Sequence, residues 1–173
     1  MKAEIVIYKI ISFVLLPVAA IFGIVCLLSI LTAISNPTML ISVFLNACMV
    51  IYVITSFIFL TKGIDGGRQC KPVLRDWIRI NAFITFAFYL LAAIAFSAIK
   101  FNKSFLNDAL QQMEAQGSIP PGITAGELQQ MAGTFVNFLL VLSILLVIHI
   151  LITFHLMNKY RNLFEPERMD IEE

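Results

Sequence analysis

Long uncharged apolar stretches organise the chain. No Lys, Arg, Asp or Glu occurs between Lys9 and Lys62, an interval too long for one membrane-spanning helix and suitable for two. A helix needs about 20 apolar residues to cross the ~30 Å hydrocarbon core of a bilayer. Continuous apolar runs also lack the alternation of β-barrel strands. The pattern therefore predicts four membrane-spanning helices, at residues 10–33, 40–60, 80–99 and 135–157.

The first two predicted spans are separated by a short polar segment. Asn36 can cap the second helix with its side-chain oxygen, and Pro37 suits the first helical position. This predicts a tight turn between two antiparallel helices. The first span is longer than the apolar core of a cleavable signal peptide, which has about 7–15 residues, so we interpret it as a retained helix.

Residues 100–134 form the one sizeable polar region that the pattern places on the side of the membrane opposite the middle loop. Ser104 stands before an apolar helical stripe, and Thr124 with Glu127 forms a T-x-x-E capping box. Helix breakers lie between Gly117 and Gly122. We predict an extracytoplasmic helical hairpin at 100–134 that extends spans three and four. A stabilising cap is the preferred interpretation of this hairpin, and a partner-binding knob is the alternative.

Composition supports a membrane setting for the whole chain. Of its 173 residues, 60% are hydrophobic and 13% charged, whereas soluble domains have about 45–50% apolar and about 25% charged residues. The predicted fold class is therefore an all-α membrane protein, with residues 1–173 forming a single four-helix transmembrane domain. The bilayer itself is the first expected partner. A net charge of +1 argues against a nucleic-acid partner.

The basic residues predict the orientation of the chain. Ten of the 12 Lys and Arg residues lie in the N-terminal segment, in the loop at 61–79 or in the tail at 158–173. Only Lys100 and Lys103 fall on the other side. Loops rich in Lys and Arg stay in the cytoplasm. We expect a multi-pass protein of a bacterial cytoplasmic membrane, with both termini and the tail at 158–173 cytoplasmic.

A few polar side chains interrupt the predicted spans. They share positions at which neighbouring helices can meet, so they predict a polar seam inside the bundle. The candidate seam residues are Asn46, Tyr52, Asn81, Thr85, Tyr89 and His149. The seam can serve as hydrogen-bonding contacts between helices or as the lining of a small cavity, and the pattern does not choose between them.

His149 is the ionisable residue nearest the middle of a predicted span. His155 follows six residues later, which places the two rings about 120° apart around the helix, so they cannot share a metal. A haem held between two helices needs a histidine on each, and no other span has one. Cys26, Cys48 and Cys70 form no C-x-x-C pair. We therefore expect neither a metal nor another cofactor, and we interpret His149 as an interhelical hydrogen-bond partner.

The chain lacks the sequence patterns of common catalytic sites. It has no H-E-x-x-H, G-x-S-x-G or P-loop motif. No Asp, Glu, Lys or Arg lies inside a predicted span, although such residues commonly mark ion and proton pathways. We expect a non-enzymatic scaffold or accessory subunit that binds itself or other membrane proteins. One alternative is a small oligomeric transporter or channel that uses the polar seam. A further alternative is a membrane redox subunit that uses His149.

Overall fold

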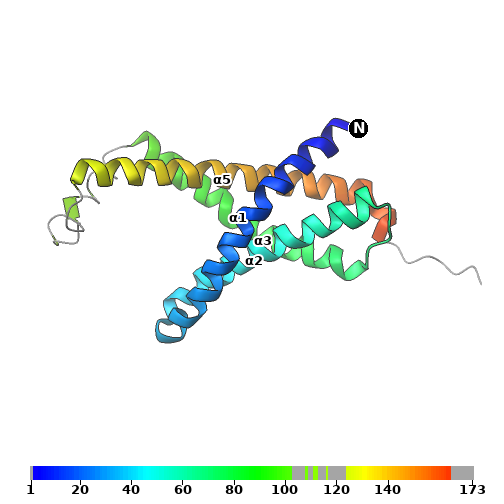
Figure 1. Ribbon diagram of the computed structural model, residues 1–173, viewed down its shortest axis with the longest axis horizontal. Coiled ribbons are helices and arrows are strands. Elements are labelled where there is room, and N and C mark those ends of the chain that lie inside the picture. The colour runs from blue at the N-terminus through cyan, green and yellow to red at the C-terminus, as the bar shows by residue number, and fades with distance from the viewer. Residues whose placement is uncertain (1, 103–107, 109–110, 113–115, 117–123, 165–173) are drawn as a thin grey trace, which may run out of the picture. The chain divides into compact units, whose positions relative to one another are not determined.

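The described part of the chain is helical. The computed structural model describes residues 2–102, 108, 111–112, 116 and 124–164 (Figure 1). The α-helices are α1 (Lys2–Ser35), α2 (Leu40–Ile58), α3 (Pro72–Phe101) and α5 (Ala125–Lys159). Three short helical segments adjoin them: the 3-10 turns η1 (Pro37–Met39) and η3 (Arg161–Phe164), and the π-helical segment η2 (Phe59–Asp65). The predicted all-α class is confirmed for these residues.

Four helical stretches within the described residues are long and apolar enough to cross a membrane. They are Ala3–Ser35, Pro37–Asp65, Pro72–Phe101 and Gly126–Lys159. These candidate spans indicate a multi-pass membrane protein. Each of these stretches extends past the predicted span ends, because an apolar run shows where a helix meets lipid and not where the helix stops.

The turn between α1 and α2 has the predicted chemistry. The Asn36 Oδ1 atom accepts hydrogen bonds from the Thr38 backbone N at 3.2 Å and from the Thr38 Oγ1 at 2.6 Å. Pro37 opens the following 3-10 turn, and α2 begins directly after it. Below the turn the two helices pack closely, since the Cys26 Sγ atom lies 3.6 Å from the Val43 carbonyl oxygen. Asn36 is therefore confirmed as the cap of the turn that leads into the second span.

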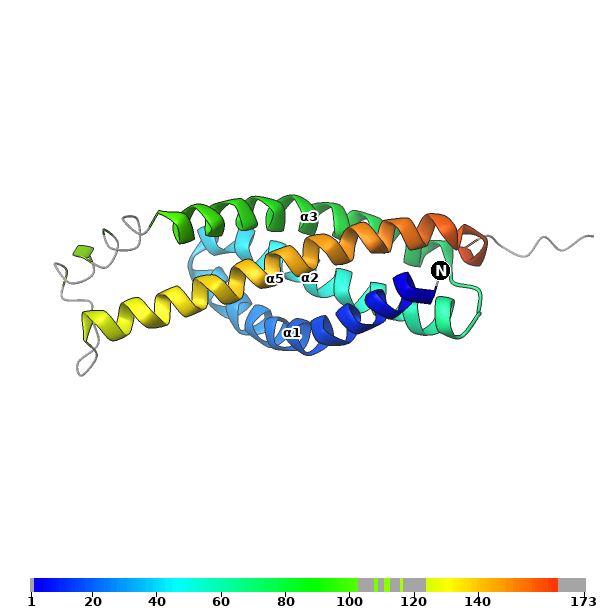
Figure 2. The ribbon, with the colours of Figure 1, turned by 90° about the horizontal axis from the view of Figure 1, so that it is seen from above.

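The chain divides into two compact units. The first contains residues 1–88 and 148–173, and the second contains residues 89–147. The first unit holds α1, α2, η2, the first half of α3, the end of α5 and η3 (Figures 1 and 2). Its core includes Leu15, Met49, Ile78, Ile150 and Leu156, each at most 1% exposed. The prediction of a single four-helix domain stays a prediction.

The loop between α2 and α3 is shorter than the predicted loop at 61–79. Helix α2 passes directly into η2, and α3 begins at Pro72, so only residues 66–71 connect them. Gly67 has φ of 58°, a left-handed conformation that glycine adopts without steric cost. The chain therefore reverses sharply within the glycine-containing segment at residues 63–69.

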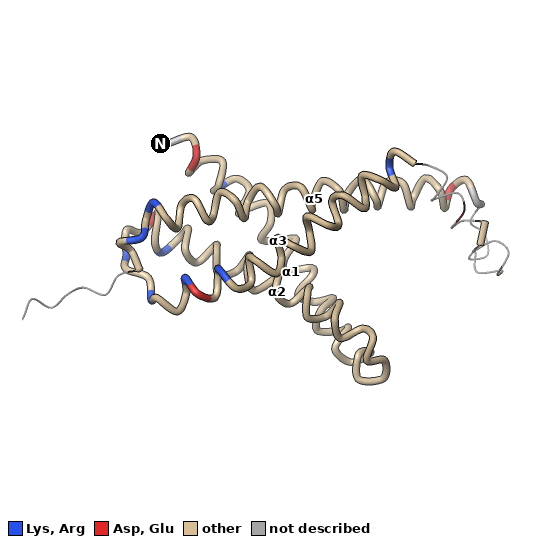
Figure 3. Tube along the Cα trace, turned by 180° about the vertical axis from the view of Figure 1, so that it is seen from behind, with Lys and Arg blue, Asp and Glu red and all other residues tan. Residues whose placement is uncertain are grey.

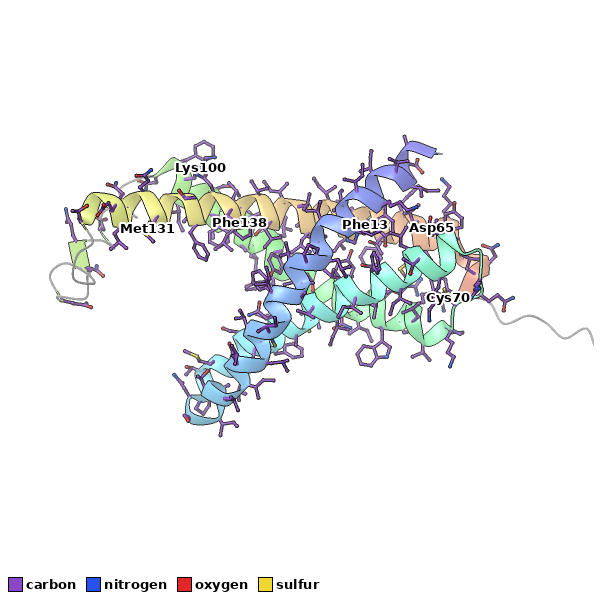
Figure 4. The ribbon with its side chains drawn as sticks, in the orientation of Figure 1. Phe13, Asp65, Cys70, Lys100, Met131 and Phe138 are labelled. Atoms are coloured by element: carbon purple, nitrogen blue, oxygen red, sulfur yellow. The ribbon has the colours of Figure 1, made fainter. Side chains whose placement is uncertain are left out.

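The C-terminal 3-10 turn docks onto that loop. The Cys70 backbone N donates to the Leu163 carbonyl oxygen at 2.7 Å, and the rings of Phe59 and Phe164 stack with centroids 5.2 Å apart. Cys70 is thus buried although it lies in a polar loop, and this burial raises the pKa of its thiol (labelled in Figure 4). The Lys9 Nζ atom also reaches the Asp65 Oδ2 atom at 2.8 Å, which ties α1 to the end of η2.

The second arm of the predicted hairpin is helical, because α5 already begins at Ala125. Its capping box is present: the Thr124 backbone N donates to Glu127 Oε2 at 2.8 Å, and the Glu127 backbone N donates to Thr124 Oγ1 at 3.3 Å. Most of the first arm and the turn, residues 103–107, 109–110, 113–115 and 117–123, lie outside the described residues. The hairpin as a whole stays a prediction.

Candidate functional site

Three helices of the first unit each contribute a polar pair spaced by four residues. A spacing of four places both side chains on one helix face. Each of these side chains is at most 2% exposed. The pairs are Tyr8 and Ser12 on α1, Tyr52 and Ser56 on α2, and His149 and Thr153 on α5. We call these six residues the His149 cluster.

Both nitrogens of the His149 ring have partners within the cluster. Nε2 lies 2.9 Å from the Ser12 Oγ atom, and Nδ1 lies 2.7 Å from the Tyr52 hydroxyl oxygen. The Tyr8 ring stacks on the imidazole with centroids 4.8 Å apart and an interplanar angle of 13°. The Tyr52 ring meets the imidazole edge-on, at 5.6 Å and 71°. The ring is therefore held from α1 and α2 at once.

The remaining contacts of the cluster join hydroxyl groups to backbone carbonyls and to one another. The Ser12 hydroxyl donates to the Tyr8 carbonyl oxygen at 2.7 Å, and the Tyr8 hydroxyl donates to the Ser56 carbonyl oxygen at 3.2 Å. The Thr153 Oγ1 atom lies 2.8 Å from the Tyr52 hydroxyl oxygen and donates to the His149 carbonyl oxygen at 2.7 Å. The Ser56 hydroxyl donates to the Val53 carbonyl oxygen at 2.9 Å, so every polar side chain of the cluster has a partner, as is usual for buried polar groups.

The hydroxyl and ring N–H protons of the cluster are fewer than the hydrogen-bonding contacts that they would have to form. A continuous path runs from the Tyr8 carbonyl through Ser12, the imidazole, Tyr52 and Thr153 to the His149 carbonyl, which makes five contacts. Both ends are carbonyls, which only accept. The three hydroxyls supply three protons and a neutral ring supplies one, which makes four. One contact is therefore always without its own proton, and a second proton on the ring would fill it.

The structure places the predicted seam residues in different surroundings. Tyr52 and His149 contact each other directly. The Asn81 side chain donates to the Trp77 carbonyl of its own helix at 2.8 Å. Asn46 is half-buried on α2. Thr85 is 1% exposed, and its hydroxyl has no hydrogen-bond partner among the described residues.

Tyr89, the sixth predicted seam residue, belongs to the second unit and is 6% exposed. Four members of the His149 cluster were missing from the predicted seam: Tyr8, Ser12, Ser56 and Thr153. Tyr8 precedes the predicted start of the first span at residue 10 and so lies outside the predicted spans. The repeated spacing of four on three helices is the signal that points to all of them. One continuous seam stays a prediction.

The described residues place no metal site beside this cluster, and the comparisons with known proteins give no match. Within the described ranges, no group of three or more His, Cys, Asp or Glu side chains is placed to hold a metal ion. His155 is exposed on α5 and does not join the cluster. Comparison with known proteins finds no matching family model, no matching curated protein and no matching solved structure. Any functional argument therefore rests on the chemistry of the chain itself.

Proposed function

We propose that this chain is a non-enzymatic membrane scaffold or accessory subunit that binds itself or other membrane proteins. The closed His149 cluster is the observation that carries the proposal. A catalytic site must be accessible to its substrate, whereas both nitrogens of His149 are held by buried side chains of the same chain. The cluster is also at most 2% exposed. Its chemistry serves to join α1, α2 and α5.

The outward surfaces supply the area that such a scaffold needs. Large apolar side chains on α1 are strongly exposed, including Leu31 at 67% and Ile34 at 77%. On α5, residues 127–138 line a groove of about 1000 Å³, and Met131 and Phe138 project from this stretch (Figure 4). Helices associate in membranes by close packing of such surfaces. These faces suit contact with the helices of a neighbouring protein.

A photo-crosslinking residue at position 131 tests this proposal in native membranes. We expect it to capture protein, and co-expression of two differently tagged copies separates self-association from binding to another membrane protein. The same residue at Gln69, exposed in the loop at 66–71, is the matched control and should capture much less. Capture of lipid alone at position 131 would contradict the proposal.

The orientation belongs to the same proposal: both termini are cytoplasmic, in a bacterial cytoplasmic membrane. Lys and Arg residues of the first unit gather around η2, the loop at 66–71 and η3 (Figure 3), and such basic ends stay in the cytoplasm. A reporter that is active only outside the cytoplasm should be silent after Glu173 and active when fused at Gln116. The opposite pattern would invert the topology.

The alternative of a small oligomeric transporter or channel is supported by the proton count of the His149 cluster. A path with four protons for five contacts can take up a proton at the ring and rearrange by rotating hydroxyls alone. Proton flux into liposomes, followed with a pH-sensitive dye, distinguishes the two functions. A transporter predicts flux that Tyr52→Phe abolishes, whereas the scaffold predicts no flux above that of empty liposomes.

The redox alternative fits the geometry less well. A haem iron needs a free imidazole nitrogen, and ligation would break the contact of His149 with Ser12 or with Tyr52. The ring face is also covered by Tyr8. A stoichiometric haem absorbance in the purified protein that disappears in His149→Ala would restore this alternative and overturn the scaffold.

A further inference from the structure

Two apolar grooves lie on either side of the outward face of α3 in the first unit. The first, of about 390 Å³, lies between α2 and α3, with Ile51 and Trp77 among its walls. The second, of about 460 Å³, lies between α3 and α5 and is closed by Phe154. Ile80 and Ile84 line both grooves. These two side chains therefore form a ridge with an apolar groove on each flank.

Among the described residues that line the two grooves, Arg79 is the one cation. Arg79 lines the second groove, is exposed, and forms neither an ion pair nor a side-chain hydrogen bond with any residue that the structure describes. Asp76 lines the first groove, but its Oδ1 atom lies 3.9 Å from the Nε of Arg75, which offsets its charge. The net charge beside the ridge is therefore positive, and it is located on Arg79.

The depth of the two grooves matches the bilayer interface. From Arg79 to Ile84 the helix rises about 7–8 Å, at 1.5 Å per residue. Trp77, 51% exposed on the rim of the first groove, is the residue type that prefers the headgroup level. The polar rim thus falls at headgroup depth and the apolar walls at the depth of the first part of the acyl chains.

We propose that this face binds one anionic diacyl phospholipid of the surrounding bilayer. Its phosphate pairs with the Arg79 guanidinium, and its two acyl chains lie in the two grooves, one on each flank of the ridge of Ile80 and Ile84. A free phosphate ion would leave both grooves unfilled. A helix of another protein that filled the same grooves would still leave the Arg79 guanidinium without an anion beside it. Charge and shape together therefore select a two-chained anionic lipid.

Retention of lipid by the full chain tests this site. The protein is purified from vesicles containing equal amounts of phosphatidylglycerol and phosphatidylethanolamine, and bound lipid is measured by native mass spectrometry. Wild type should retain phosphatidylglycerol preferentially. Arg79→Gln should retain about fivefold less of it, the change expected for one cation lost beside an anionic headgroup. Arg68→Gln, exposed in the loop and lining neither groove, is the matched control and should behave as wild type.

A second variant separates the grooves from the charge. Ile84→Trp enlarges the ridge into both grooves, so it should lower retention of either lipid while the Arg79 charge remains. Unchanged helical circular dichroism shows that each variant still folds. Equal retention of the two lipids by wild type, or unchanged retention by Arg79→Gln, would overturn the proposal. A photo-crosslinker at Ile80 that captures a second copy instead of lipid would overturn it as well, and inorganic phosphate alone should not raise the thermal stability of the protein.

Discussion

His149 and Thr85 are both polar, both buried in the first unit and both in candidate membrane spans, yet their surroundings differ. His149 is 0% exposed, and each ring nitrogen has a partner on another helix. Thr85 is 1% exposed, and its hydroxyl has no partner among the described residues. It does not even donate to its own helix, as Thr153 does to the His149 carbonyl. Burial alone therefore does not show that a polar residue joins helices. It joins them only where its hydrogen-bond partner lies on another helix.

The largest effect should come from emptying the centre of the cluster. His149→Ala should lower the free energy of unfolding by about 2–4 kcal/mol, because it leaves a cavity beneath the stacked Tyr8 ring. Lost hydrogen bonds are the smaller part, at about 0.6 kcal/mol each in a membrane. Reversible unfolding in mixed micelles measures the change. His155→Ala, on the exposed face of the same helix, is the control. An equal loss of stability in both variants would contradict the special contribution of His149 to the bundle.

A smaller effect should follow from deleting a single hydroxyl. Tyr52→Phe keeps the ring and removes the oxygen that contacts His149 and Thr153, so we expect a loss of about 1 kcal/mol. Combining it with Thr153→Val should cost less than the sum of the two single changes, because they share one contact. Tyr160→Phe, at the end of α5, serves as the control. Strict additivity of the two cluster variants would contradict the coupling.

The smallest effect should appear at Thr85. Thr85→Val replaces an unpaired buried hydroxyl by a methyl group of similar size, so stability should stay the same or rise by up to about 1 kcal/mol. Thr153→Val makes the same chemical change at a paired hydroxyl and should destabilise the protein. The two variants are compared in one unfolding assay. A clear loss of stability in Thr85→Val would mean that this hydroxyl has a partner outside the described residues.

Local chemistry explains which features could be predicted from the sequence. The four spans, the Asn36 turn and the capping box of Thr124 and Glu127 depend on residues close together in the chain, so composition and spacing suffice. The ends of the helices could not be predicted from the apolar runs. Helix α1 begins at Lys2, and ion pairs hold its charged start, such as the Lys159 Nζ atom 2.9 Å from Glu4.

The partners of His149 depend on which helix faces meet, and the sequence holds that information only indirectly. His149 suggested an interhelical hydrogen bond to Thr, Tyr or Asn, and the structure places Tyr52 and Ser12 on its two nitrogens. Ser12 was missed because a serine in an apolar helix usually bonds to its own backbone. It does so here as well, to the Tyr8 carbonyl, and in addition lies within hydrogen-bonding distance of the His149 Nε2 atom.

Because α5 contributes His149 and Thr153, the His149 cluster can form only late in synthesis of the chain. The chain emerges from its N-terminus, so α1 and α2 enter the membrane before residues 148–164 exist. Until then, Ser12 and Tyr52 lack the imidazole that both contact in the finished protein. A nascent chain that stalls before His149 therefore presents polar side chains to lipid that the complete chain hides.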